Sequence, residues 1–174
     1  NTLVLDGGDT FHGQTIATLN KGESIAKIMN TIGYDAMAPG NHDFNYGYER
    51  LVELDGITNF PILSANVVKS DGSSLLTPYV VKEIAGVKVG IFGLTTPETT
   101  YKTHPDNVKG LTFQDPAESA KEMVEILKDQ TDVIIAIAHL GMDKASVDTS
   151  IKVANEVPGI DLIVDAHSHT VLEN

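Results

Sequence analysis

The chain has 174 residues, 41% hydrophobic and 21% charged, which is enough for one sizeable core and gives no compositional sign of disorder. Its 24 acidic and 12 basic residues give a formal net charge of −12, which disfavours binding to nucleic acid or to an anionic membrane surface. The chain has no cysteine, so disulfides and thiolate sites are excluded and any metal site must use His, Asp, Glu or Asn.

Short apolar runs alternate with amphipathic helical stretches along the chain, which is typical of an α/β fold. We predict one domain with these elements in chain order: strand 2–6, helix 22–33, strand 34–38, helix 48–54, strand 60–67, antiparallel hairpin 78–94, helix 115–129, strand 132–138, helix 146–157 and strand 161–166. The clearest helix start is at 115–129, because Asp115 can cap it, Pro116 suits the first helical position and Glu118 completes a capping-box-like pattern.

Polar side chains follow four of the predicted strands at the point where each strand ends. The motifs are GGD after 2–6, GNHD after 34–38, a histidine at the end of 132–138, and HSH after 161–166. The residues concerned are Asp9, Asn41, His42, His139, His167 and His169. Because the carboxyl ends of parallel strands share one edge of a sheet, where ligands bind, we expect these residues to converge. One histidine at a strand end is usually structural, but this many at four strand ends indicates a shared metal site.

The types of these residues also indicate which metals fit. Imidazole, carboxylate and amide oxygen suit Zn, Mn, Fe or Co better than calcium. Asp9 follows two glycines that allow close approach of the backbone, so its carboxylate could bridge two ions about 3.5–4 Å apart. Such a pair of ions suits in-line attack on phosphorus by a bridging hydroxide, with the cations neutralising the phosphate oxygens.

The motifs GGD, GNHD, AHLG and HSH resemble, in this order, the blocks of the calcineurin-like metallophosphoesterases, within the 5′-nucleotidase branch. The resemblance covers nearly the whole chain and implies an αββα sandwich with mostly parallel central strands and an antiparallel hairpin. It also implies two divalent transition metal ions. Asp9 would bridge them, Asn41, His139 and His167 would complete one site, and His169 would belong to the other.

The same resemblance gives His42 the role of stabilising the transition state and protonating the leaving oxygen. Three further residues are candidates for contacting and orienting the metal ligands and His42, namely Asp43, Asn45 and His12. For His12, a place in a loop without such a role is the simpler interpretation. Read without the other motifs, GNHD is simply a turn made by Gly40. Asn45 occupies the position at which many family members have an aspartate that pairs with the catalytic histidine. Because an asparagine stabilises an imidazolium less than a carboxylate does, we expect His42 to be less basic.

Two further departures from the family pattern concern the ends of the chain. The family's first block, an Asp-x-His on a preceding strand, is not found, so the second ion lacks two expected protein ligands. The resemblance also implies a C-terminal nucleotide-binding domain, which we expect to lie outside residues 1–174. We therefore expect residues 1–174 to be a catalytic-domain fragment that is inactive or weakly active alone.

The resemblance implies hydrolysis of nucleotide phosphoesters, with a 5′-nucleotidase as the leading interpretation. The alternatives are a 2′,3′-cyclic-nucleotide 2′-phosphodiesterase/3′-nucleotidase, favoured by Asn45, a UDP-sugar hydrolase and, from another class, a non-catalytic binding module. No apolar stretch approaches the roughly 20 residues of a membrane span. By resemblance, the expected location is extracellular, periplasmic or associated with the cell wall, although no signal peptide is visible.

Overall fold

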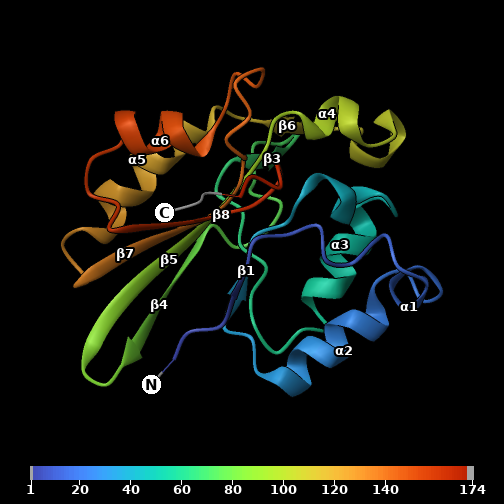
Figure 1. The fold of residues 1–174 in the computed structure, drawn as a ribbon, viewed down its shortest axis with the longest axis horizontal. Coiled ribbons are helices and arrows are strands. Elements are labelled where there is room, and N and C mark those ends of the chain that lie inside the picture. Colours follow the sequence, from blue (N-terminus) through green and yellow to red (C-terminus); the bar gives the residue numbers. More distant parts are fainter. Residues whose placement is uncertain (1, 172–174) are drawn as a thin grey trace.

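The computed structural model describes residues 2–171 (Figure 1). Its α-helices and 3₁₀ helices (η) are α1 (Thr15–Thr18), α2 (Glu23–Ile32), η1 (Asn41–Phe44), α3 (Tyr48–Asp55), α4 (Thr99–Lys102), η2 (Pro105–Val108), α5 (Pro116–Leu127) and α6 (Ser150–Glu156). Its strands are β1 (Leu5–Asp6), β2 (Ala36–Met37), β3 (Val67–Lys69), β4 (Tyr79–Ile84), β5 (Val87–Thr95), β6 (Leu111–Phe113), β7 (Val133–His139) and β8 (Leu162–Asp165).

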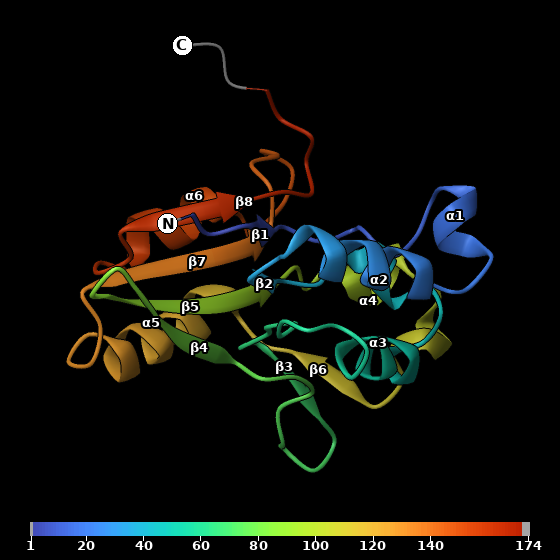
Figure 2. The ribbon, with the colours of Figure 1, turned by 90° about the horizontal axis from the view of Figure 1, so that it is seen from below.

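The elements are stacked in four layers, with helices outside and strands inside. In Figures 1 and 2, α5 and α6 lie on one side of the sheet β4-β5-β7-β8, and α2 and α3 lie beyond β1 and β2 on the other. The alternation of β7 explains this arrangement. Ala136 and Ala138 pack with buried residues of α5 and α6, whereas Ile135 and Ile137 pack with residues of β2. The predicted αββα sandwich is therefore confirmed.

The larger sheet combines parallel and antiparallel pairing, as the sequence predicts. β5, β7 and β8 are parallel, while β4 pairs antiparallel to β5 as a hairpin. The hairpin turns at Ala85 and Gly86, whose φ angles of 52° and 84° belong to the left-handed conformation that short hairpin turns require. Because β5, β7 and β8 run in the same direction, their carboxyl ends meet at one edge.

The predicted strand at 60–67 is wrong. Ile62 and Leu63 form only isolated bridges, and β3 begins at Val67 and pairs antiparallel with β6. The Asn66 side chain explains the interruption, since its amide donates to the Thr95 carbonyl at 2.8 Å and accepts from the Thr95 N–H at 2.9 Å. A side chain thus takes hydrogen bonds that a neighbouring strand would otherwise take.

Several short elements are absent from the sequence prediction, namely α1, α4, η1, η2 and β6. Each has only three or four residues, too few to show a hydrophobic period. The helix predicted at 146–157 begins at Ser150, because the Thr149 side chain caps it by accepting from the Lys152 N–H at 3.2 Å. Within residues 2–171, none of the helices combines the length and apolar character that crossing a membrane requires.

The cap of α5 leads to a first prediction. Asp115 accepts hydrogen bonds from the N–H groups of Ala117 and Glu118 at 2.7 and 3.2 Å and pairs with Lys152 at 2.9 Å. We expect Asp115→Ala to lower the free energy of unfolding by about 1 kcal/mol in urea denaturation. Because the Lys152 ammonium lowers the pKa of Asp115, this contribution is present above the ordinary carboxyl pKa and lost as the pH falls through the lowered value.

Asp115→Ser is the matched control, since serine can cap α5 but cannot pair with Lys152. It should retain most of the stability. An equal loss in both variants would mean that the ion pair, and not the cap, stabilises this helix.

Candidate metal and catalytic site

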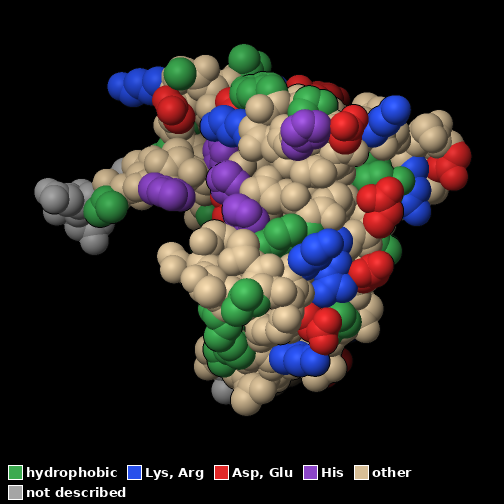
Figure 3. Space-filling view, turned by 90° about the vertical axis from the view of Figure 1, so that its right-hand side faces the viewer, with side chains coloured by type: hydrophobic (Ala, Val, Ile, Leu, Met, Phe, Trp, Pro, Cys, Tyr) green, Lys and Arg blue, Asp and Glu red, His purple; other side chains and the backbone are tan. Residues whose placement is uncertain are grey.

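Three of the predicted ligands lie together at the carboxyl ends of the strands. Asp9 follows β1, His139 ends β7 and His167 follows β8, and their potential ligand atoms all lie within 4.8 Å of one another. They line a cavity of about 680 Å³. On the face shown in Figure 3, several histidine side chains gather in one area. Three of the six side chains expected to converge therefore lie together in the structure.

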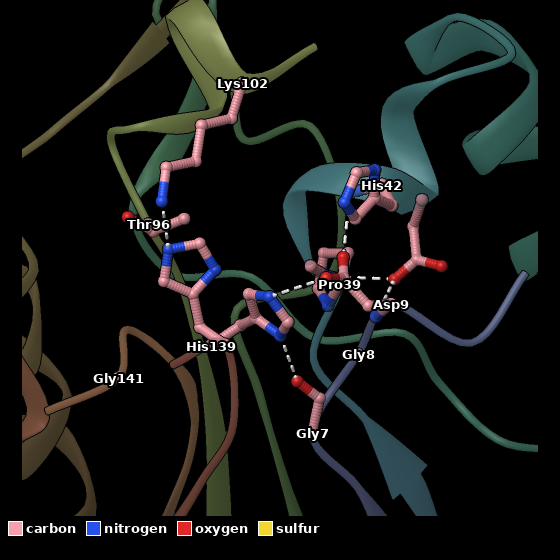
Figure 4. A network of polar contacts seen from close by, with 12 residues as sticks. Gly7, Gly8, Asp9, Pro39, His42, Thr96, Lys102, His139 and Gly141 are labelled. Carbon is pink, nitrogen blue, oxygen red and sulfur yellow. Dashed lines mark hydrogen bonds and ion pairs between the residues drawn. The ribbon is translucent and has the colours of Figure 1, made fainter. Parts of the chain in front are cut away.

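Asp9 lies on a strained turn that points its carboxylate at the neighbouring motif. Its φ angle is 62°, in the left-handed region that residues with a Cβ rarely adopt. Its Oδ1 accepts the backbone N–H of His42 at 2.7 Å, so the GGD and GNHD loops are directly connected (Figure 4). Burial works against ionisation of Asp9, but His139 and the His42 N–H lower the pKa of its carboxyl, which favours the charged form.

His139 is held with one nitrogen engaged and the other free. Its Nδ1 donates to the Gly7 carbonyl at 2.6 Å, as Figure 4 shows, which leaves the lone pair on Nε2. This Nε2 lies 3.2 Å from Asp9 Oδ2 but is not aligned for a hydrogen bond, and it is buried without a hydrogen-bond partner among residues 2–171. Although burial works against protonation, Asp9 raises the pKa of His139.

Asn41 supplies a second buried atom without a partner. The residue is 2% exposed and its side-chain oxygen Oδ1 has no hydrogen-bond donor among the described residues. Two buried acceptors, Asn41 Oδ1 and His139 Nε2, thus belong to adjoining motifs and lack donors. A cation satisfies such atoms, and imidazole, carboxylate and amide oxygen are suitable ligands for a transition metal. These residues therefore fit a divalent ion.

The two histidines of HSH differ in their placement. His167 has a φ angle of 87° and packs edge-on against His139, with ring centroids 4.9 Å apart. Burial, together with the nearby His139 and Lys102, lowers the pKa of His167, which favours the neutral ring that binds metals. His169 has a φ angle of 51°, lines the same cavity and is exposed, but lies outside the three-residue cluster. Its assignment to a second ion stays a prediction.

His42 is exposed, and its hydrogen bonds define which nitrogen carries the proton. Asn107 Nδ2 donates to Thr103 Oγ1 at 3.3 Å, and that hydroxyl donates to Asn45 Oδ1 at 2.8 Å. The Asn45 amide nitrogen therefore faces His42 Nδ1 at 3.0 Å and donates to it. A neutral His42 consequently carries its hydrogen on Nε2. His12, the remaining candidate, stacks on the His42 ring with centroids 5.8 Å apart.

Asp43 connects the two loops that carry Asp9 and Asn41. It is 1% exposed, and its Oδ2 accepts the N–H groups of Asp9 and Gly40, both at 2.8 Å. Its Oδ1 accepts those of Thr10 at 3.0 Å and Phe11 at 2.8 Å. Burial raises the pKa of Asp43 to about 6, against the effect of the N–H groups of Phe11 and Gly40.

Three further residues support the site and were not predicted from the sequence. Asp165 accepts the N–H of Gly141 at 3.0 Å and the Ser150 hydroxyl at 2.6 Å, which joins the end of β8 to the loop after β7 and to the start of α6. Glu98, which directly precedes α4, and Lys102, the last residue of α4, both contact His167. Only the position of Asp165, directly before AHSH, could have indicated its role, because the contact of Glu98 with His167 spans 69 positions.

Gly40 leads to a second prediction. A Cβ at this position would lie 2.5 Å from His139 Cε1 and 2.7 Å from the Asp9 nitrogen, and would also collide with Asp9 Oδ1. We expect Gly40→Ala to lower the free energy of unfolding by about 1–3 kcal/mol, as other overpacked sites do, and to weaken metal binding. Denaturation and metal titration measure the two effects.

Gly56→Ala is the control, since its added Cβ would meet its nearest atom, the Glu53 carbonyl oxygen, at 3.4 Å. That variant should keep its stability and metal affinity. If Gly40→Ala behaves like Gly56→Ala, the two loops are not packed as closely as described.

Known proteins resemble this chain over its whole length. The family model of the calcineurin-like phosphoesterases matches residues 1–171. A 5′-nucleotidase of Vibrio cholerae is 36% identical over 97% of this chain and 32% of its own length, and one of Bos taurus is 39% identical over 99% and 30%. The crystal structure of the calcineurin-like phosphoesterase YfkN from Bacillus subtilis superposes with a TM-score of 0.89, at 32% identity, over 100% of this chain and 60% of that one.

This chain therefore spans about a third of the length of the curated relatives it matches. The family model covers nearly the whole sequence and includes the four motifs that end the strands. The chain belongs to the calcineurin-like phosphoesterase family.

Proposed function

We propose that this chain is the catalytic domain of a longer protein that hydrolyses nucleotide phosphoesters, with 5′-nucleotidase as its leading activity. The observation that carries the proposal is the convergence of Asp9, His139 and His167 within 4.8 Å, beside the GNHD loop. The 5′-nucleotidases among its relatives support the substrate class.

Four residues would hold one divalent transition metal ion: Asp9, Asn41, His139 and His167. Asp9 and His169 would contribute to a second, whose other ligands we propose lie outside residues 1–174. When bound, such ions supply positive charge that activates water and neutralises phosphate oxygens. The chain contributes ligands that are already oriented, since Gly7 and Asp43 fix His139 and the two loops.

His42 would protonate the leaving oxygen. Asn45 donates to Nδ1, so the neutral ring keeps a hydrogen on Nε2 that it can give to a leaving alkoxide. The His42 side chain is exposed and reachable by substrate, whereas its backbone N–H is held by Asp9. Fixed donors of this kind favour a substrate whose leaving group needs protonation, such as a nucleoside.

The second candidate is a 2′,3′-cyclic-nucleotide phosphodiesterase, which the resemblance favours through Asn45, the residue that contacts His42 at 3.0 Å. The UDP-sugar hydrolase and the non-catalytic module have no specific structural observation in their favour. Unpartnered Asn41 Oδ1 and His139 Nε2 argue against a module that has lost its ion.

The activity is tested by assaying the full-length protein with AMP, 2′,3′-cyclic AMP and UDP-glucose in the presence of Mn²⁺, Zn²⁺ or Co²⁺. Phosphate release that is greatest from AMP supports the 5′-nucleotidase. Preference for the cyclic nucleotide or for UDP-glucose would replace it with the corresponding alternative. Absence of turnover with every substrate and metal would contradict the proposal.

A third prediction concerns the isolated chain. Since the first site has four candidate ligands and the second only Asp9 and His169, we expect residues 1–174 to bind about one transition metal ion tightly and to hydrolyse nucleotides poorly. Elemental analysis of the purified chain, with a phosphate-release assay, measures both. Two tightly bound ions and rapid turnover would show that no ligand from outside these residues is needed.

The proposed location is outside the cytoplasm, in the periplasm, in the cell wall or in the extracellular space. It rests on the resemblance to 5′-nucleotidases. Fractionation of cells that express the full-length protein tests it, and recovery with cytoplasmic markers would contradict it.

A further inference from the structure

Glu98, Lys102 and His167 form a close triangle beside the metal cluster. Glu98 Oε2 lies 2.8 Å from Lys102 Nζ and 3.1 Å from His167 Nε2, and Lys102 Nζ lies 3.2 Å from the same ring nitrogen. Lys102 lies on the far side of the site from Asp9 in Figure 4. The His167 and Glu98 side chains are only 6% and 13% exposed, so water competes little for their contact.

The two contacts of His167 Nε2 require opposite proton placements. A carboxylate can only accept, so contact with Glu98 requires a hydrogen on Nε2 and leaves the lone pair on Nδ1. Lys102 can only donate, so a hydrogen bond from Lys102 would require the lone pair on Nε2 and the hydrogen on Nδ1. Only the first placement leaves a nitrogen that can bind a metal on the side away from Glu98.

The charges favour the placement required by Glu98. The Lys102 ammonium stabilises the carboxylate of Glu98, so Glu98 faces the ring as an acceptor. Lys102 already has a partner in the same oxygen, Glu98 Oε2, at 2.8 Å. Lys102 therefore does not need to donate to the His167 ring. If Nε2 carried no hydrogen, its lone pair would face the Glu98 carboxylate and be repelled by it, so the hydrogen is favoured on Nε2.

His139 provides a parallel within the same cluster. Its Nδ1 donates to the Gly7 carbonyl, and its Nε2 keeps the lone pair and has no hydrogen-bond partner in the part of the chain that the structure describes. In both rings, one nitrogen would donate its hydrogen to an oxygen acceptor, which is the Gly7 carbonyl for His139 Nδ1 and Glu98 for His167 Nε2. The other nitrogen would keep its lone pair for a metal. We propose that Glu98 is a positioning residue that holds His167 with its hydrogen on Nε2 and leaves Nδ1 as the metal-binding nitrogen.

This inference rests on the proposed metal site for its functional meaning, but the position of the hydrogen is measurable without metal. We would record ¹⁵N shifts of the histidine rings in the 174-residue chain at mildly alkaline pH, assigning His167 by the signals missing in His167→Gln. The expected result is one dominant tautomer with the hydrogen on Nε2. A dominant hydrogen on Nδ1 would overturn the inference.

Two variants separate Glu98 from Lys102. Glu98→Gln keeps the shape but offers an amide N–H that can donate to Nε2, so we expect a marked shift of His167 toward the other tautomer. Lys102→Met removes the competing donor and should leave the hydrogen on Nε2. The reverse pattern, with His167 sensitive to Lys102 and indifferent to Glu98, would assign the role to Lys102 and overturn the inference.

Titration with Co²⁺ alone, followed by its visible absorption, gives a second readout. We expect Glu98→Gln to weaken Co²⁺ binding by about 10- to 100-fold, as loss of a partner behind a ligating histidine typically does. Glu125→Gln is the matched control, because the exposed Glu125 side chain on α5 pairs with Lys128 and has no ion pair with a histidine of residues 2–171. Equal affinities of Glu98→Gln and the native chain would contradict the inference.

The two proposals can fail separately. If the ring shifts and Co²⁺ affinities follow expectation but the full-length protein hydrolyses no phosphoester, the proposed function is wrong and the role of Glu98 stands. If the full-length protein is active but the hydrogen of His167 lies on Nδ1, the role of Glu98 is wrong.

Discussion

His42→Ala is expected to reduce phosphate release from a nucleoside monophosphate by about 100- to 10,000-fold in the full-length protein, the usual contribution of a general acid. The reason is the hydrogen bond from Asn45 to Nδ1 at 3.0 Å, which leaves Nε2–H as the proton donor. Metal content should not change, because the ring of His42 lies outside the cluster of Asp9, His139 and His167. Steady-state kinetics and elemental analysis measure both.

The leaving group provides an internal control for this role. A p-nitrophenolate leaves without protonation, so His42→Ala should slow hydrolysis of p-nitrophenyl phosphate much less than that of AMP. His104→Ala, in an exposed loop, should leave both rates unchanged. Equal losses with the two substrates would indicate that His42 binds phosphate and does not donate a proton.

Asp43→Ala is expected to lower the free energy of unfolding by about 4 kcal/mol or more, because a buried N–H without an acceptor costs about 1–3 kcal/mol. Four N–H groups depend on this carboxylate, two of them in buried hydrogen bonds (Phe11 and Gly40) and two in partly buried ones (Asp9 and Thr10). Removal of a buried charge offsets part of the loss, but four lost hydrogen bonds outweigh it. Denaturation in urea measures the change.

A graded series distinguishes this cause from loss of packing. Asp43→Asn keeps the shape and one acceptor oxygen, so it should lose roughly half as much stability as Asp43→Ala. Asp106→Ala, at a side chain that is 81% exposed, should remain within about 0.5 kcal/mol of the native chain. Equal losses in the asparagine and alanine variants would mean that the charge, and not the number of acceptors, is what the loops require.

The sequence predicts the parts of the fold that depend on local patterns. The apolar run of β7, the turn at Ala85 and Gly86 and the cap at Asp115 all lie where the residues indicate. The strand predicted at 60–67 is wrong because Asn66 bonds to Thr95, which lies 29 positions away. A run of apolar residues carries no information about such a partner.

The same division applies to the candidate site. Asp9, His139 and His167 could be expected to meet, since parallel strands end at one edge, and the structure brings them together. The exposure of His169 could not be predicted, because it depends on how the chain leaves the HSH turn. The contacts of Glu98 and Asp43 could not be predicted either, because they depend on the packing of loops from separate parts of the chain. The roles of all these residues stay predictions.

The left-handed backbone at Asp9, His167 and His169 has a consequence for protein engineering. Each residue holds a conformation that costs about 1–2 kcal/mol in residues with a Cβ, and glycine would relieve it. A redesign that ranks substitutions by thermostability alone would therefore favour glycine at these three positions and delete candidate ligands. Stabilising mutations are better sought elsewhere, and any library built on this scaffold should hold these three positions constant.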